Sequence, residues 1–298
     1  MTRNLNPNPR AQRRAVFTTL TALALLAGLL LLTGCHGGKP RQDPILQLSA
    51  EESLTQGKAL LAKLKYAAAR PYFTHAYEVE PNSANGREAL LLAADTFYLE
   101  GGSTDFVQSE AKYRDYLNRF PTSDQAAYVQ FQIANSLAKR MERPDRDQAV
   151  TRKAYEAYQD LIRLYPTSEY AAQAQEQVEV VRANLAEHEF IIGRFYMRYG
   201  SPRAAADRFE YLLKNFPRYA ARDKVMYYMG VAYSLSSNPE ESQKAWERLK
   251  KEYPQSPYVA ETTAVKKAGG VPDTLTQNYI TKLLARRDYL SGARSTAP

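Results

Sequence analysis

Hydrophobic and polar residues follow a helical period along most of this chain. From about Ser49 to about Ala260, stretches with apolar residues three and four positions apart alternate with short segments that contain proline. No stretch sustains the period of two that is typical of a half-buried strand. The pattern therefore predicts an all-α fold.

The proline segments recur at intervals that predict a structural repeat. Their prolines are 40, 45, 51 and 37 residues apart, at Pro81, Pro121, Pro166, Pro217 and Pro254. This spacing resembles the tetratricopeptide repeat, a helix pair of about 34 residues, with insertions. In that repeat, a small residue at position 8 of the first helix packs against residues 20 and 24 of the second. A proline at position 32 ends the second helix.

Three repeats match this register without a gap. Counting back from the proline places a glycine at position 8, a small residue at 20 and an aromatic residue at 24: Gly57, Ala69 and Phe73; Gly193, Ala205 and Phe209; Gly230, Ser242 and Trp246. The second and third repeats need insertions, which are expected in longer loops around Gly101-Gly102 and Glu142 to Asp147. The second repeat has Ala94 at position 8 and Tyr113 at 24, and the third has Ala154 at position 20 and Tyr158 at 24. Most tyrosines are thereby expected in the core.

The fold expected is a tetratricopeptide-repeat superhelical solenoid of five helix pairs over residues 48–267, plus a C-terminal helix. One further helix is expected to reach about Lys267. The pattern also predicts a helix from about Asp273 to Leu290, capping the solenoid, and a disordered tail, both within residues 268–298.

The N-terminal segment has the layout of a cleavable signal. Four arginines precede an uncharged stretch from Ala15 to Leu32, and Leu32-Thr33-Gly34-Cys35 resembles the lipobox of bacterial lipoproteins. Residues 1–34 are therefore predicted to be removed, Cys35 to be lipidated by fatty acids such as palmitate, and residues 35–47 to form a flexible tether. An uncleaved membrane anchor is the alternative, and both interpretations place the rest of the chain outside the cytoplasm. In lipoproteins an Asp after the cysteine favours the inner membrane, and His36 here indicates the periplasmic face of the outer membrane.

Charge gives little support to a nucleic-acid partner. The net charge is +8, and removing the four signal arginines leaves 36 basic and 32 acidic residues. The remaining charge is spread in clusters of two residues, as expected of solvated helix faces.

The sequence offers no reaction centre and no cofactor site. His36, His75 and His188 lie far apart, and no cysteine or histidine pair has metal-ligand spacing. Phosphate-binding glycine loops are absent. Acidic pairs such as Glu187 and Glu189 are interpreted as a solvated helix face. The chain is predicted not to be an enzyme.

The first helices of a solenoid line a surface suited to binding an extended segment. Positions 2, 5, 9 and 12 usually face this groove, and position 5 is apolar or aromatic in all five repeats: Leu54, Leu91, Phe131, Phe190 and Tyr227. With Tyr98 and Tyr128 they predict an apolar groove, where Asn135 or Arg194 contacts a peptide backbone. The alternative is that position 5 only packs against the neighbouring repeat.

Two segments resemble the BamD (YfiO) family of outer-membrane lipoproteins. They run from Arg146-Asp147 to Tyr165-Pro166-Thr167-Ser168-Glu169-Tyr170, and from Leu185 to Tyr196 with Arg208-Phe209-Glu210 after it. The resemblance covers about Tyr128 to Tyr233. It implies a scaffold of the machine that assembles β-barrel proteins, with BamA, other Bam lipoproteins and nascent barrel proteins as partners.

The family also implies where the partner binds. A second-helix arginine of the fourth repeat contacts BamA in the family, and the motif places Arg208 there, beside Glu210; the alternative is an exposed arginine without a partner of consequence. Another tetratricopeptide lipoprotein, serving pilus assembly, peptidoglycan enzymes or cell-envelope coordination, is the alternative function. A periplasmic hydrolase would need a nucleophile and base that the sequence lacks.

Overall fold

The computed structural model describes residues 43–267, and side chains as far as Thr262. The chain divides into two units, residues 1–48 and 49–298. In the first unit, the structure describes a short 3-10 helix, η1 (Pro44–Gln47), at the end of the segment predicted to be the tether. The predicted signal, Cys35, the helix from Asp273 and the tail lie outside the described residues.

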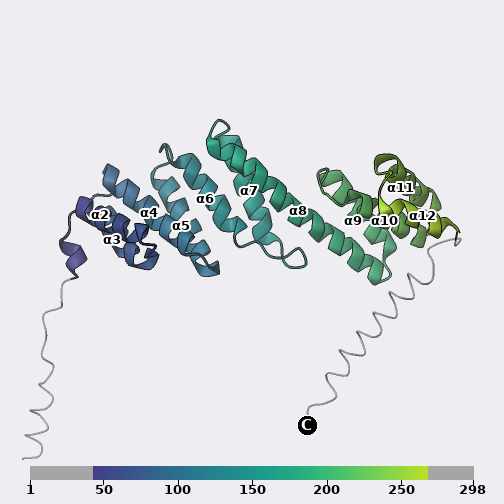
Figure 1. Cartoon of the computed structure of the whole chain (residues 1–298), viewed down its shortest axis with the longest axis horizontal. Coiled ribbons are helices and arrows are strands. Elements are labelled where there is room, and N and C mark those ends of the chain that lie inside the picture. The colour runs from purple at the N-terminus through teal and green to yellow at the C-terminus, as the bar shows by residue number, and fades with distance from the viewer. Residues whose placement is uncertain (1–42, 268–298) are drawn as a thin grey trace, which may run out of the picture. The chain divides into compact units, whose positions relative to one another are not determined.

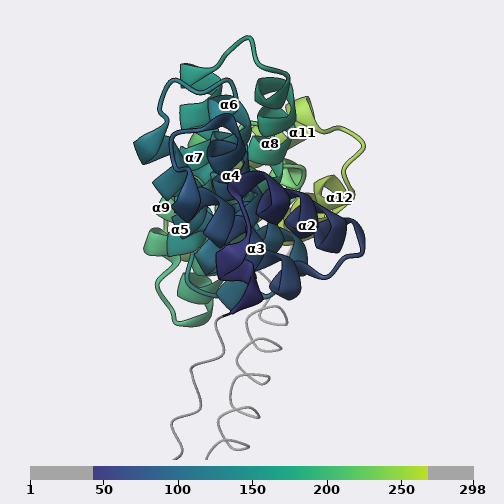
Figure 2. The ribbon, with the colours of Figure 1, turned by 90° about the vertical axis from the view of Figure 1, so that its left-hand side faces the viewer.

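The described part of the second unit consists of five consecutive helix pairs and one further helix, as Figure 1 shows. The pairs are α2 (Ala50–Ala62) and α3 (Tyr66–Val79), α4 (Ala84–Glu100) and α5 (Ser103–Arg119), α6 (Ala126–Ala138) and α7 (Ala149–Leu164), α8 (Glu169–Arg198) and α9 (Pro202–Asn215), and α10 (Arg222–Leu235) and α11 (Pro239–Glu252). The further helix predicted after Pro257 is present as α12 (Pro257–Lys267), which reaches the last described residue. Each helix packs chiefly on its neighbours in the sequence, and Figure 2 looks along this row from the α2–α3 end. The tetratricopeptide-repeat solenoid of five pairs is confirmed.

Local sequence explains the ends of these helices. Ser49 and Glu52 cap α2 reciprocally: each side chain accepts the backbone N–H of the other residue, at 3.2 and 2.9 Å. All five second helices end one residue before the residue that precedes a repeat proline. A residue before proline is disfavoured in the helical region. Phe120, for example, has φ −130° and ψ 62°.

The predicted contact between positions 8 and 24 is present in the three ungapped repeats. A Cβ atom added to Gly57 would lie 2.6 Å from the Phe73 ring, and one added to Gly193 would lie 2.4 Å from the Phe209 ring. A Cβ atom added to Gly230 would lie still closer to its partner, 2.1 Å from the Trp246 ring. Glycine is thus required for each pair of helices to approach so closely.

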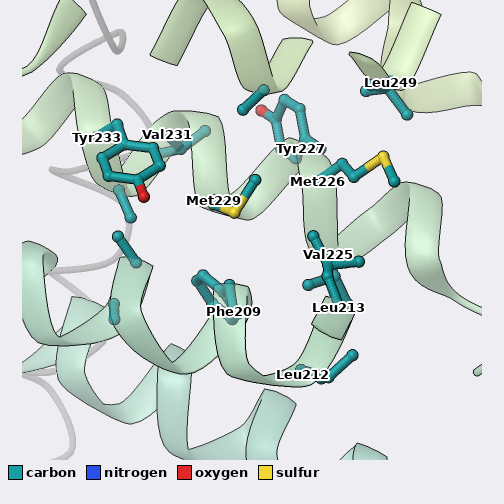
Figure 3. Close-up of a cluster of buried hydrophobic side chains, with 14 of the residues drawn as sticks. Phe209, Leu212, Leu213, Val225, Met226, Tyr227, Met229, Val231, Tyr233 and Leu249 are labelled. Atoms are coloured by element: carbon teal, nitrogen blue, oxygen red, sulfur yellow. The ribbon is translucent and has the colours of Figure 1, made fainter. Parts of the chain in front are cut away.

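The buried side chains form three clusters along the row. The last cluster contains buried residues of four consecutive helices, from α8 through α11. Figure 3 shows Phe209, Leu212 and Leu213 of α9 with Val225, Met226 and Met229 of α10. The middle cluster ends at Val181 and the last begins at Ala186, both on α8. This helix of 30 residues, about 45 Å long, therefore belongs to two cores.

One predicted insertion lies elsewhere than expected. In the second repeat the extra residues lengthen α4 and α5 to 17 residues each, and only Gly101 and Gly102 separate the two helices. Both glycines have positive φ, 79° and 95°, which lets the chain reverse within two residues. The longer loop predicted around Glu142 to Asp147 is confirmed between α6 and α7.

Candidate partner-binding surface

The predicted groove is not open along the whole row of first helices. Four of the five residues at position 5 are buried, with at most 8% of each residue's surface exposed: Leu54, Leu91, Phe190 and Tyr227. They pack into the three cores, because neighbouring repeats approach too closely to leave position 5 accessible. For these four residues the prediction of a peptide-lining role was wrong. Phe131 alone among the five is half-buried.

An accessible group of aromatic side chains remains on the first helices of the second, third and fourth pairs. Tyr98 of α4, Tyr128 and Phe131 of α6, and Tyr170 of α8 are all half-buried. The Tyr170 ring centroid lies 5.7 Å from that of Tyr128 and 5.5 Å from that of Phe131. These four residues, with Asp95 between them on α4, are called the aromatic surface below.

Asn135 contributes to this region differently from the prediction. Its amide oxygen accepts a hydrogen bond from the Tyr158 hydroxyl at 2.7 Å, and its amide nitrogen donates to Gln132 at 3.0 Å. Both ends of the amide are thus engaged within the chain. A role in contacting a peptide backbone would require these bonds to be exchanged.

Phe190 and Arg194 lie together in the fourth repeat. The Phe190 ring is packed against Phe209 and Tyr228, at centroid distances of 5.7 and 5.5 Å. The Arg194 guanidinium lies 6.0 Å from the Phe190 centroid, and the Lys224 ammonium lies 4.5 Å from it. The two cations cover a ring that is itself buried.

Arg208 on α9 has a partner within the chain. Its Nη1 donates to Oε2 of Glu189 on α8 at 3.2 Å, and this is the one hydrogen bond of its guanidinium within the described part of the chain. The Arg208 side chain is 42% exposed and that of Glu189 only 11%. Glu189 therefore binds one nitrogen of a guanidinium group that stays partly accessible to solvent. The prediction that Glu189 lies on a solvated face was wrong.

Glu210 lies two residues beyond Arg208 and points to a different helix. It accepts a hydrogen bond from the Tyr233 hydroxyl of α10. Burial, followed by the bond and charge of Glu210, raises the pKa of that hydroxyl above its ordinary value. Arg208 and Glu210 thus connect α9 to the helices on either side of it.

Sequence reasoning missed several residues of these surfaces. Asp95 occupies position 9 of the second repeat, a groove position, so the register could have indicated it. Tyr170 lies outside the positions considered, in the N-terminal part of α8. Phe195 and Tyr199, 50% and 63% exposed with ring centroids 4.3 Å apart, form an aromatic pair at the end of α8.

Two further features concern alternative functions. Over residues 43–267, no three histidine, cysteine or acidic side chains are grouped so that they could hold a metal ion. His188 is engaged with the α6–α7 loop, its Nδ1 lying 2.7 Å from the Pro144 carbonyl oxygen. None of the helices in residues 43–267 combines the length and the apolar composition that spanning a bilayer requires.

Comparison with known families decides the identity. The model of a family described as "YfiO: Outer membrane lipoprotein" matches residues 47–245, which include α2 to α10 and half of α11. The chain belongs to the YfiO family. Arg208, Glu189 and the aromatic surface all lie inside the matched region of this YfiO-family chain.

Two relatives are named as assembly factors for outer membrane proteins. The putative outer membrane protein assembly factor BamD of Aquifex aeolicus is 36% identical over 206 residues, which cover 68% of this chain and 65% of that protein. The outer membrane protein assembly factor BamD of Rickettsia prowazekii is 25% identical, covering 80% of this chain and 93% of its own length. Among solved structures, the TPR2AB domain of yeast Sti1 has 15% sequence identity and a TM-score of 0.39. The match covers 82% of this chain and 94% of that structure.

Proposed function

We propose that this YfiO-family chain is the lipid-anchored scaffold subunit of the machine that assembles β-barrel proteins in the outer membrane. The observation that carries the proposal is the family match over residues 47–245, supported by relatives named outer membrane protein assembly factor. The proposed work is binding, with no covalent step. The proposed partners are the periplasmic domains of a BamA-like barrel subunit, the other lipoproteins of the machine and nascent barrel proteins.

The contact with the barrel subunit is proposed to centre on Arg208. Its guanidinium is half-exposed, and Glu189 fixes one of its nitrogens. A planar guanidinium can bind a carboxylate through two parallel hydrogen bonds, which a lysine ammonium cannot reproduce. Tyr211, one turn further along α9 and 48% exposed, supplies apolar surface beside it.

The attachment is proposed to be the lipid on Cys35. The lipobox and the uncharged stretch before it support this position on the sequence. Two or three acyl chains, at about 0.8 kcal/mol per buried methylene, make such attachment effectively permanent. The solenoid would then act at the periplasmic face of the outer membrane.

Depletion of the chain in its native bacterium tests the function. Outer-membrane proteins are quantified by mass spectrometry as the chain is lost, and folded barrels are scored by their resistance to unfolding in detergent. The proposal expects folded barrel proteins to fall severalfold while lipoproteins without barrels stay constant. Unchanged barrels with altered pili or peptidoglycan would refute it and favour the alternative function.

A further inference from the structure

Among the side chains of residues 43–262, none forms an ion pair with the carboxylate of Asp95 on α4. Its Oδ1 accepts hydrogen bonds from the hydroxyls of Tyr113 at 2.6 Å and Tyr128 at 2.9 Å. Both of these hydrogen bonds go to Oδ1, and within residues 43–262 no hydrogen bond to Oδ2 is formed. Asp95 is half-buried, so part of the residue remains accessible to solvent. A desolvated charge of this kind favours a counter-ion.

A chain of hydrogen bonds across three helices ends at this carboxylate. The Tyr158 hydroxyl donates to Asn135, whose amide donates to Gln132. The Gln132 amide in turn donates to the Tyr128 hydroxyl at 3.0 Å, and Tyr128 donates to Asp95. Every donor points toward Asp95, which an ionised carboxylate suits because it can only accept. The network therefore holds the carboxylate in a fixed orientation as an acceptor.

Half-buried aromatic rings lie next to Asp95 and Tyr128 in this network. Tyr98 follows Asp95 by one helical turn, and Tyr128 carries both a hydrogen bond to Asp95 and an edge-to-face contact with Tyr170. Phe131 packs on Tyr170 at 5.5 Å. The faces of such rings attract cations, and Arg and Lys side chains bury their alkyl stems against them.

We propose that the aromatic surface binds an arginine or lysine side chain of an extended segment of a partner protein, with Asp95 as its counter-charge. The surface draws on α4, α6 and α8, the first helices of three successive pairs, so it runs across repeats as an extended segment would. An acidic or purely apolar side chain would leave the desolvated carboxylate unpaired. The residues differ from Arg208, and the inference does not depend on the contact proposed there.

Paired peptides test this directly on the full chain in mild detergent. One fluorescein-labelled peptide has the sequence Gly-Ser-Leu-Thr-Arg-Thr-Leu-Ser-Gly with blocked ends, and its twin carries citrulline, a neutral isostere, in place of arginine. Fluorescence anisotropy gives both dissociation constants. The wild-type chain is expected to bind the arginine peptide about fivefold more tightly or better. Equal affinities, or no binding, would overturn the proposal.

Variants connect that preference to Asp95. In Asp95→Asn, which keeps an oxygen for both phenols, the two peptides should bind within about twofold of each other. Asp115→Asn removes the same charge from an exposed pair with Arg119 on α5 and should leave the preference intact. If Asp95→Asn fails to fold, as judged by circular dichroism, Tyr170→Leu is tested instead. This substitution should weaken the binding of the arginine peptide and leave the binding of the citrulline peptide unchanged. A preference that survives in the substituted chain would contradict the assignment.

Discussion

Glu189 of α8 holds the guanidinium of Arg208 of α9, with Oε2 3.2 Å from Nη1. The Glu189 carboxylate is nearly buried, whereas the Arg208 guanidinium is half-exposed. The arginine is therefore held by a residue inside the protein while part of it remains accessible to a partner. This arrangement gives the arginine a defined orientation before any partner arrives. Preorganisation of this kind lowers the entropy lost on binding.

Gly193→Ala should destabilise the solenoid. The new Cβ would lie 2.4 Å from the Phe209 ring, and overpacking a filled core costs about 1–3 kcal/mol. The better helix propensity of alanine returns at most about 1 kcal/mol. Urea unfolding followed by circular dichroism measures the change, and Phe209→Leu in the same chain should relieve it. A higher unfolding midpoint for Gly193→Ala alone would show that the helices can separate.

Arg70→Ala should weaken the junction of the first two repeats. The Arg70 guanidinium lies 3.8 Å from the centroid of the Phe97 ring and donates to the hydroxyl and carbonyl oxygens of Thr96 at 3.2 and 3.3 Å. Losing these contacts should lower the free energy of unfolding by about 1–3 kcal/mol. Arg163→Ala, which breaks an exposed pair with Asp160, is the control and should cost less than about 0.5 kcal/mol. Equal losses in thermal unfolding would contradict a special role for Arg70.

Asp95→Asn should stabilise the folded chain near neutral pH. Burial raises the pKa of the Asp95 carboxyl, although the bonds from Tyr113 and Tyr128 act against this. A raised folded-state pKa means that stability from this group is present at low pH and is lost as the pH rises through that pKa. The advantage of the variant over wild type should therefore shrink as the pH falls. Urea unfolding between about pH 4 and pH 8 measures it; an advantage that grows on acidification would disprove the reasoning.

Cys35→Ala should abolish lipid attachment. The mature N-terminal peptide of the wild-type chain is expected to begin at Cys35 and to carry acyl chains, because the predicted lipobox would direct cleavage before that residue. Mass spectrometry of membrane-extracted protein and incorporation of labelled palmitate provide the measurements. A wild-type peptide that extends upstream of Cys35 would support the uncleaved anchor instead.

The helix pairs could be predicted from sequence because their signals are local. Proline ends each second helix, and the pairing of Gly193 with Phe209 follows from a fixed spacing within one repeat. The single long helix α8 escaped prediction, although Glu169 to Arg198 contains no proline.

The candidate surfaces were harder to predict because they depend on contacts between repeats. The repeat pattern gives Phe131 and Phe190 the same position in two different repeats. Packing by neighbouring helices nevertheless buries Phe190 and leaves Phe131 partly accessible. The acceptor role of Glu189 depends on Arg208, 19 residues away on another helix. A charged residue in an amphipathic pattern gives no sign of such a partner.

Affinity purification of the membrane-extracted chain, with mass spectrometry of the bound proteins, tests the central proposal most directly. Wild type is compared with Arg208→Glu and with Arg203→Glu, an exposed arginine on the same helix that undergoes the same change of charge. A BamA-like barrel protein should be recovered with wild type and Arg203→Glu and fall at least about tenfold with Arg208→Glu, as expected for a hot-spot arginine. Recovery of pilus or peptidoglycan proteins in its place would contradict the assembly function, and equal recovery with all three chains would contradict the role of Arg208.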